Sequence, residues 1–212
     1  MNRRTLSLVV SASLSLALLA AAPFVRAADE APDTLIKRIS VDVLDNIKAD
    51  KAVQGGDMSR VISLVDTKIM PNVDFTRMTA SAVGRNWRSA TPEQKKRLQE
   101  EFKTLLIRTY SGALAQVRDQ NINVKPLRGA LPTDTEVVVR TEVLGSGDPA
   151  QLDYRMEKTD TGWKIYDLNV LGVWLVETYR TQFAQEINAK GVDGLIASLS
   201  LRNKNNLSGK KS

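Results

Sequence analysis

The chain has 212 residues with a formal net charge of +6, and it contains neither cysteine nor histidine. The absence of cysteine excludes disulfide frameworks, thiol nucleophiles and thiolate metal sites. The absence of histidine removes the usual general base and the commonest zinc ligand. We therefore expect no catalytic residue, no metal site and no cofactor, although carboxylates, lysine, tyrosine or serine could still support catalysis.

The first 27 residues have the composition of an export signal. Met1–Arg4 is basic, Leu6–Ala22 is apolar, and Val25–Ala27 offers small residues to a signal peptidase. A spanning helix needs about 20 mainly apolar residues, and this stretch is shorter and interrupted by serines. We predict that residues 1–27 are cleaved on export, leaving a mature protein with a net charge of +3. This mild charge gives no indication of nucleic-acid binding.

Apolar residues recur at helical spacing through the next part of the chain. Four helices are expected: one after Asp33-Thr34 that ends before Gly55-Gly56, one after Asp57, one from Asp74 to near Gly84, and one beginning at Thr91. The last has the clearest start, because Thr91-Pro92-Glu93-Gln94 matches a capping box with proline at the first helical position.

After Asp119 the apolar period changes to two, which is typical of strands. The expected strands cover residues 121–126, 135–144, 151–158 and 163–170. A turn at Thr159–Gly162 joins the last two as a hairpin. Two further helices follow, separated at Lys190-Gly191.

Helices placed before and after one antiparallel sheet predict an α+β domain with the sheet's apolar face covered by helices. We assign residues 28–202 to one such domain and residues 203–212 to a disordered basic tail. The apolar faces could fill a core or enclose a cavity, and periodicity does not distinguish the two. An architecture related to the cone-shaped NTF2-like fold fits the same pattern.

Several segments resemble the MlaC family, also called toluene-tolerance proteins. They include Met70–Phe75, Ala82–Arg85 with Trp87, and the Ser89–Gln94 helix start. The second half adds Trp163–Asp167, Gly172-Val173, Tyr179–Phe183 and Gly191–Leu195. The matching segments extend over essentially the whole mature chain. Their order and spacing make the resemblance specific.

The resemblance implies a periplasmic phospholipid carrier that maintains outer-membrane lipid asymmetry and has no enzymatic activity. Its implied pocket lies between sheet and helices and takes the acyl chains. It also implies two partners, an inner-membrane ABC transporter with an MCE-domain subunit and an outer-membrane lipoprotein associated with a porin, with the carrier itself a monomer. The inward-facing residues expected to contact lipid are Phe75, Met78, Val83, Phe102, Leu106, Tyr110, Val137, Val139, Leu152, Tyr154, Met156, Tyr166 and Leu168.

Arg85 and Arg88, on either side of Trp87, are candidates for partner docking or for contact with the lipid headgroup. On a continuous strand, Tyr166 and Leu168 would share one face, and Ile165 and Asp167 the other. Two alternatives remain: a periplasmic chaperone or adaptor that binds an apolar peptide or lipoprotein anchor, and an NTF2-like enzyme with Asp167 as base beside Tyr166 or Tyr154.

Overall fold

The computed structural model describes residues 30–127 and 133–205, so the predicted signal peptide lies outside the described residues. The helices are α1 (Pro32–Ala49), α2 (Lys51–Gln54), α3 (Met58–Leu64), α4 (Phe75–Val83), α5 (Pro92–Ala115) and α6 (Leu175–Asn205), with short helical turns η1 (Val65–Ile69), η2 (Met70–Asn72) and η3 (Gly84–Trp87). The strands are β1 (Asn121–Val124), β2 (Glu136–Val139), β3 (Thr141–Leu144), β4 (Ala150–Thr159), β5 (Gly162–Val170) and β6 (Val173–Trp174).

The strands form one antiparallel sheet in the order β1-β3-β4-β5-β6, with β2 also paired to β4. About four strands were expected, and the sheet contains six. The predicted strand 135–144 is interrupted at Arg140, although β2 and β3 keep the same register against β4. The strand β6 was not predicted, because a strand of two residues is too short to show an alternating pattern.

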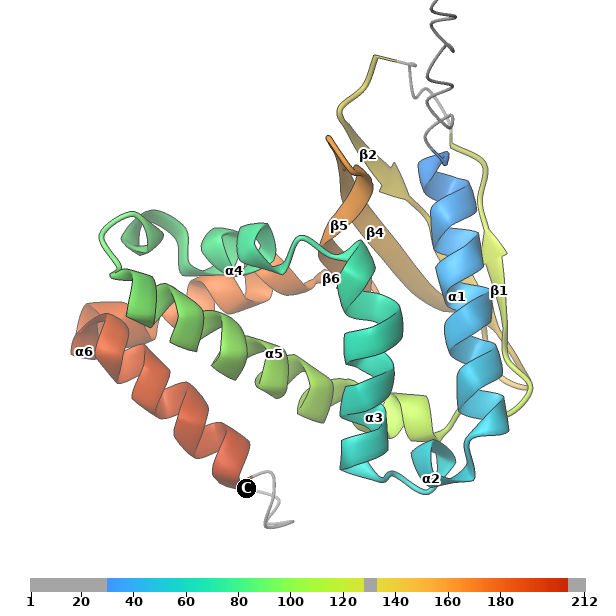
Figure 1. The fold of residues 1–212 in the computed structure, drawn as a ribbon, viewed down its shortest axis with the longest axis horizontal. Helices are drawn as coiled ribbons and strands as arrows, with labels where there is room; N and C mark the ends of the chain where they lie inside the picture. The colour runs from blue at the N-terminus through green and yellow to red at the C-terminus, as the bar shows by residue number, and fades with distance from the viewer. Residues whose placement is uncertain (1–29, 128–132, 206–212) are drawn as a thin grey trace, which may run out of the picture.

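The predicted α+β class is confirmed. Figure 1 shows α1 running along the sheet, α4, α5 and α6 grouped as a separate helical layer, and α3 between these two parts. None of the described helices is long and apolar enough to cross a membrane.

The capping box predicted at Thr91 is present at the start of α5. The Gln94 amide donates to Thr91 Oγ1 at 3.2 Å, and the Thr91 amide donates to Gln94 Oε1 at 3.0 Å. These bonds satisfy amides that have no partner inside the helix. The first turn of the longest uninterrupted helix is thus specified by local sequence.

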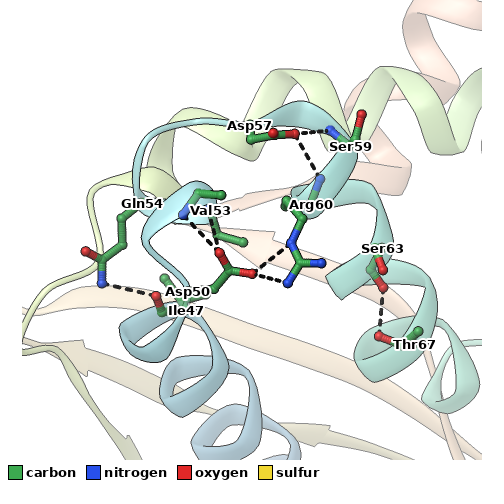
Figure 2. A network of polar contacts seen from close by, with 10 residues as sticks. Ile47, Asp50, Val53, Gln54, Asp57, Ser59, Arg60, Ser63 and Thr67 are labelled. Atoms are coloured by element: carbon green, nitrogen blue, oxygen red, sulfur yellow. Dashed lines mark hydrogen bonds and ion pairs between the residues drawn. The ribbon is translucent and has the colours of Figure 1, made fainter.

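The corner between α1, α2 and α3 is held by two aspartates and one arginine (Figure 2). Asp50 accepts from the amides of Ala52 and Val53 and so caps α2. Asp57 caps α3 in the same way. Arg60 then joins the two helices, because its guanidinium donates to Asp50 Oδ2 at 2.9 and 2.6 Å. This pairing lowers the pKa of Asp50.

The two helices predicted at the C-terminus meet at Gly191 within α6. Gly191 has φ 71°, which breaks the helical path, and a left-handed φ of this kind favours glycine. Residues 203–205, expected in the tail, instead form the last turn of α6, because the buried Asn203 donates to the carbonyl of Glu101 at 2.9 Å. The rest of the predicted tail, 206–212, lies outside the described residues.

Candidate functional site

Buried apolar side chains form separate clusters within the described residues. The helical cluster is built from α4, α5 and α6, and Phe102 is completely buried in it. The Phe102 ring centroid is 5.0 Å from that of Tyr179 and 5.2 Å from that of Phe183. The sheet cluster lies between α1 and the strands, and a third cluster joins α1, α2, α3 and α5.

The predicted lipid-contacting residues divide between the first two clusters. The helical cluster contains or contacts Phe75, Met78, Val83, Phe102, Leu106 and Tyr110. The sheet cluster contains or contacts Val137, Val139, Leu152, Tyr154 and Met156. Leu168 packs against both. The fold therefore divides the predicted lipid-contacting residues between the helical cluster and the sheet cluster, and Leu168 lies where the two clusters meet.

Three apolar residues each pack against two clusters and are only partly buried. Val73 and Leu168 contact both the helical and the sheet clusters, and Val43 contacts the sheet cluster and the third cluster. We call these three residues the junction. The sequence pattern missed Val43 and Val73 as junction residues, because contacts such as the parallel bridge between Val73 and Ile165 are not encoded in local periodicity.

Burial separates the predicted residues into two types. Met78, Val83, Phe102, Val139, Tyr154 and Met156 are buried and belong to close-packed clusters. By contrast, the side chains that retain partial exposure and could meet a ligand with little repacking are Phe75, Leu106, Tyr110, Val137, Leu152 and Leu168.

The expectation that Tyr166 and Leu168 share a face is wrong. The register between β4 and β5 shifts at Arg155/Met156, so Met156 pairs with Ile165 and Arg155 pairs with Asp167. The irregularity leaves Tyr166 as an extra residue, and Ile165 and Leu168 then both reach the sheet cluster. A β-bulge of this kind leaves no clear mark in the alternation of a single strand.

Tyr166 instead belongs to a charged group with Arg77 from α4. The Arg77 guanidinium carbon lies 3.7 Å from the Tyr166 ring centroid, and the Tyr166 hydroxyl donates to Glu136 at 3.1 Å. Arg77 also forms ion pairs with Glu136 and Glu157. Hydrogen bonding from Arg77 lowers the pKa of Glu136, whereas burial raises the pKa of Tyr166. These contacts tie α4 to β2, β4 and β5.

Two carboxylates of the sheet, Asp153 and Asp167, are both buried. Asp167 accepts from the amides of Leu168 and Val176 and from Arg155, at 2.8 to 3.0 Å. Burial raises the pKa of Asp167 despite these donors. Because these bonds hold Asp167 against Arg155 and the start of α6, they indicate a structural role rather than a free general base.

Arg85 lies in η3 and Arg88 directly follows it, so both belong to the connection between α4 and α5. Both side chains are exposed, and neither forms an ion pair with another described residue. Between them, the partly buried Trp87 packs against the helical cluster, and Lys95 Nζ lies 5.6 Å from its ring centroid. In Figure 1 this connection lies at the end of the helical layer farthest from the sheet.

The described residues also line cavities elsewhere on the surface. One of about 400 Å³ is lined by Lys125, Pro126, Val138 and Arg140. Another, of about 300 Å³, lies between the two halves of α6 and includes Gln182, Glu186, Ser198 and Arg202. No junction residue lines either cavity, so neither is the predicted lipid site.

Comparison with known proteins gives consistent results. The family model described as MlaC protein matches residues 37–201. The "Toluene tolerance protein ttg2D" of Pseudomonas putida is 28% identical over 180 residues, covering 84% of this chain and 83% of that protein. The "Intermembrane phospholipid transport system binding protein MlaC" of Haemophilus influenzae is 21% identical over 176 residues, covering 81% and 82%.

A solved structure extends this similarity to three dimensions. The phospholipid-binding protein from Ralstonia solanacearum, determined in complex with a phospholipid, is 49% identical. It superposes with a TM-score of 0.81, covering 85% of this chain and 99% of that chain. The shared fold is therefore one that accommodates a phospholipid in at least this relative.

Proposed function

Because the chain belongs to the MlaC family, we propose that it binds a phospholipid by its acyl chains and carries it through the periplasm between the outer and inner membranes. The relative from Ralstonia solanacearum, crystallised with a phospholipid, supports the choice of ligand. The relative from Haemophilus influenzae is an intermembrane phospholipid transport system binding protein, and this supports the choice of activity.

The observation that carries this proposal is that two junction residues, Val73 and Leu168, contact both the helical and the sheet clusters. Protein interiors normally pack into one dense core without voids. Here Val73 and Leu168 join two clusters while remaining partly exposed, and Phe75, Leu106 and Leu152 pack against the adjoining clusters. Acyl chains entering along this boundary would meet apolar side chains from both layers.

The energetics of such a site suit a carrier. A lipid with two acyl chains has on the order of 30 methylene groups, and burial of each contributes roughly 0.8 kcal/mol. The gross sum of about 24 kcal/mol exceeds any observed non-covalent affinity, but a bilayer provides equivalent burial. Transfer is then an exchange between similar environments, so no catalytic group or cofactor is required.

The proposed partners are those implied by the family resemblance. Lipid would be exchanged with an inner-membrane ABC transporter bearing an MCE-domain subunit and with an outer-membrane lipoprotein associated with a porin. The carrier would act as a monomer exported by a cleaved signal peptide. Arg85 and Arg88 are proposed to contact a partner, since they are exposed at the end of the helical layer and form no ion pair with the part of the chain that the structure describes.

Organic extraction of the purified protein, followed by mass spectrometry, tests the proposal. We expect phospholipid in an amount comparable to that of the protein. The same extraction of an unrelated periplasmic protein, purified in parallel, controls for lipid carried over from membranes. No enrichment of phospholipid over this control would overturn the proposed function, and an apolar peptide in its place would support the chaperone alternative.

A further inference from the structure

The hairpin between β5 and β6 has an unusual apex. Leu171 and Gly172 form its two-residue turn, with φ 54° and 89° respectively. Such turns favour asparagine followed by glycine, because both positions require positive φ. Among the described residues, Leu171 is the only residue other than glycine with positive φ. A leucine here is a poor choice for the turn itself.

Leu171 contributes little to packing either. Its side chain is 68% exposed, and Val173 across the turn is 52% exposed. Leu144, which is 38% exposed, ends β3 at the same end of the sheet, since Val143 pairs with Ala150 at the start of β4. The whole segment from Val170 to Val176 contains no charged residue. An exposed apolar apex of this kind indicates a binding role.

The two backbone amides of the apex donate hydrogen bonds within the protein. The Leu171 amide donates to the carbonyl of Gln151 at 3.0 Å, and the Gly172 amide donates to Asn169 Oδ1 at 2.8 Å. Val173 pairs with Val170 to close the hairpin. A segment whose amides are already satisfied leaves fewer polar groups unpaired when it enters the apolar edge of a bilayer.

The residues behind the apex connect it to the proposed lipid site. Val170 packs against the helical cluster, and Leu168 on the same strand is a junction residue. On the other side of the turn, Trp174 lies with its ring centroid 3.9 Å from the guanidinium carbon of Arg155. Tryptophan and arginine are both suited to the boundary between acyl chains and headgroups.

We propose that this apex, Leu171 to Val173, inserts shallowly into the surface of a phospholipid bilayer. The inference rests on the proposed function, because a lipid carrier has reason to meet a bilayer. A protein pocket is the less favoured occupant, since specific protein interfaces normally include several hydrogen bonds. At this apex the amides of Leu171 and Gly172 are already occupied internally and the side chains are apolar.

Binding to phosphatidylcholine vesicles, measured by flotation, tests the inference. Leu171→Asn replaces the apolar side chain with the residue that the turn prefers. We expect its affinity for vesicles to fall roughly tenfold, because one leucine side chain would no longer be buried in the apolar part of the bilayer. Its thermal unfolding midpoint should match or exceed that of the original protein. Val173→Thr, which keeps a branched β-carbon, should also bind more weakly.

Leu201→Asn is the matched control, because Leu201 is a 60% exposed leucine in α6. Its vesicle affinity should not change. Failure of the original protein to bind vesicles, or equal loss in Leu171→Asn and Leu201→Asn, would overturn the inference. Slower lipid delivery to membrane proteins with unchanged vesicle binding would also overturn it, in favour of a protein pocket. If organic extraction of the original protein yields phospholipid, the proposed function stands even when one of these outcomes overturns the insertion of the apex.

Discussion

Tyr154 is buried in the sheet cluster, between α1 and the strands. Desolvation raises the pKa of Tyr154 to about 12. An unfolded tyrosine titrates near pH 10. Because the folded state retains the proton more strongly, the stability that this shift contributes is fully present below pH 10 and is lost as the pH rises towards 12.

We therefore expect urea unfolding midpoints to fall steeply as the pH rises above about 10. Tyr154→Phe keeps the aromatic ring in the sheet cluster but removes the hydroxyl that ionises. Its midpoint should therefore depend less on pH in the alkaline range. Tyr166→Phe serves as the comparison, since Tyr166 is only partly buried. Equal alkaline slopes for the original protein and Tyr154→Phe would refute this assignment.

Strands of the same sheet differ in what covers their inner face. Val139 in β2 is 0% exposed, and it belongs to the sheet cluster together with Leu35, Ile36 and Ile39 from α1. Leu152 in β4 is partly exposed and pairs with Val170, close to the β5–β6 turn. The same inward alternation thus places one residue in a filled core and the other beside the proposed site.

This difference predicts opposite results for one substitution at two positions. Leu152→Trp should sharply reduce the phospholipid that copurifies, while circular dichroism and unfolding midpoint stay near those of the original protein. Val139→Trp should destabilise the fold by about 1–3 kcal/mol, because the core around it has no room for a larger ring. If Leu152→Trp retained full lipid content, Leu152 would have to be removed from the site.

The distribution of charge over the whole molecule separates two roles proposed for Arg85 and Arg88. Many other cations are paired, including Arg38, Arg60 and Arg77. The two arginines form no ion pair within residues 30–127 and 133–205, and they lie on the connection farthest from the sheet in Figure 1. This position favours contact with an acidic partner over contact with the headgroup of a lipid held against the sheet.

Reversing both charges, in Arg85→Glu with Arg88→Glu, should slow lipid delivery to membranes containing the partner complexes by roughly tenfold at low salt. The dependence of the rate on ionic strength should flatten, because exposed charges act mainly on encounter. Bound lipid should be unchanged. Reversal of Lys37 and Lys51, exposed cations of α1 and α2, controls for net charge. A double variant purified without lipid would instead assign the arginines to the headgroup.

The sequence by itself determined the start of α5, the break in α6 and the inward face of β4, because their causes are local. The Thr91 capping box, the break at Gly191 and the inward alternation of Tyr154 and Met156 all appear in the structure as predicted. Each depends on residues within a few positions of one another, so backbone geometry and amphipathic spacing suffice.

Only the tertiary structure decided which apolar faces meet and which remain partly open. The β5 irregularity that turns Tyr166 towards Arg77, and the contacts that make Val73 and Leu168 junction residues, join segments far apart in the chain. The exposure of Leu171 likewise depends on what the rest of the fold leaves uncovered. Periodicity records which side chains avoid water, but burial depends on packing between distant elements, which one segment cannot encode.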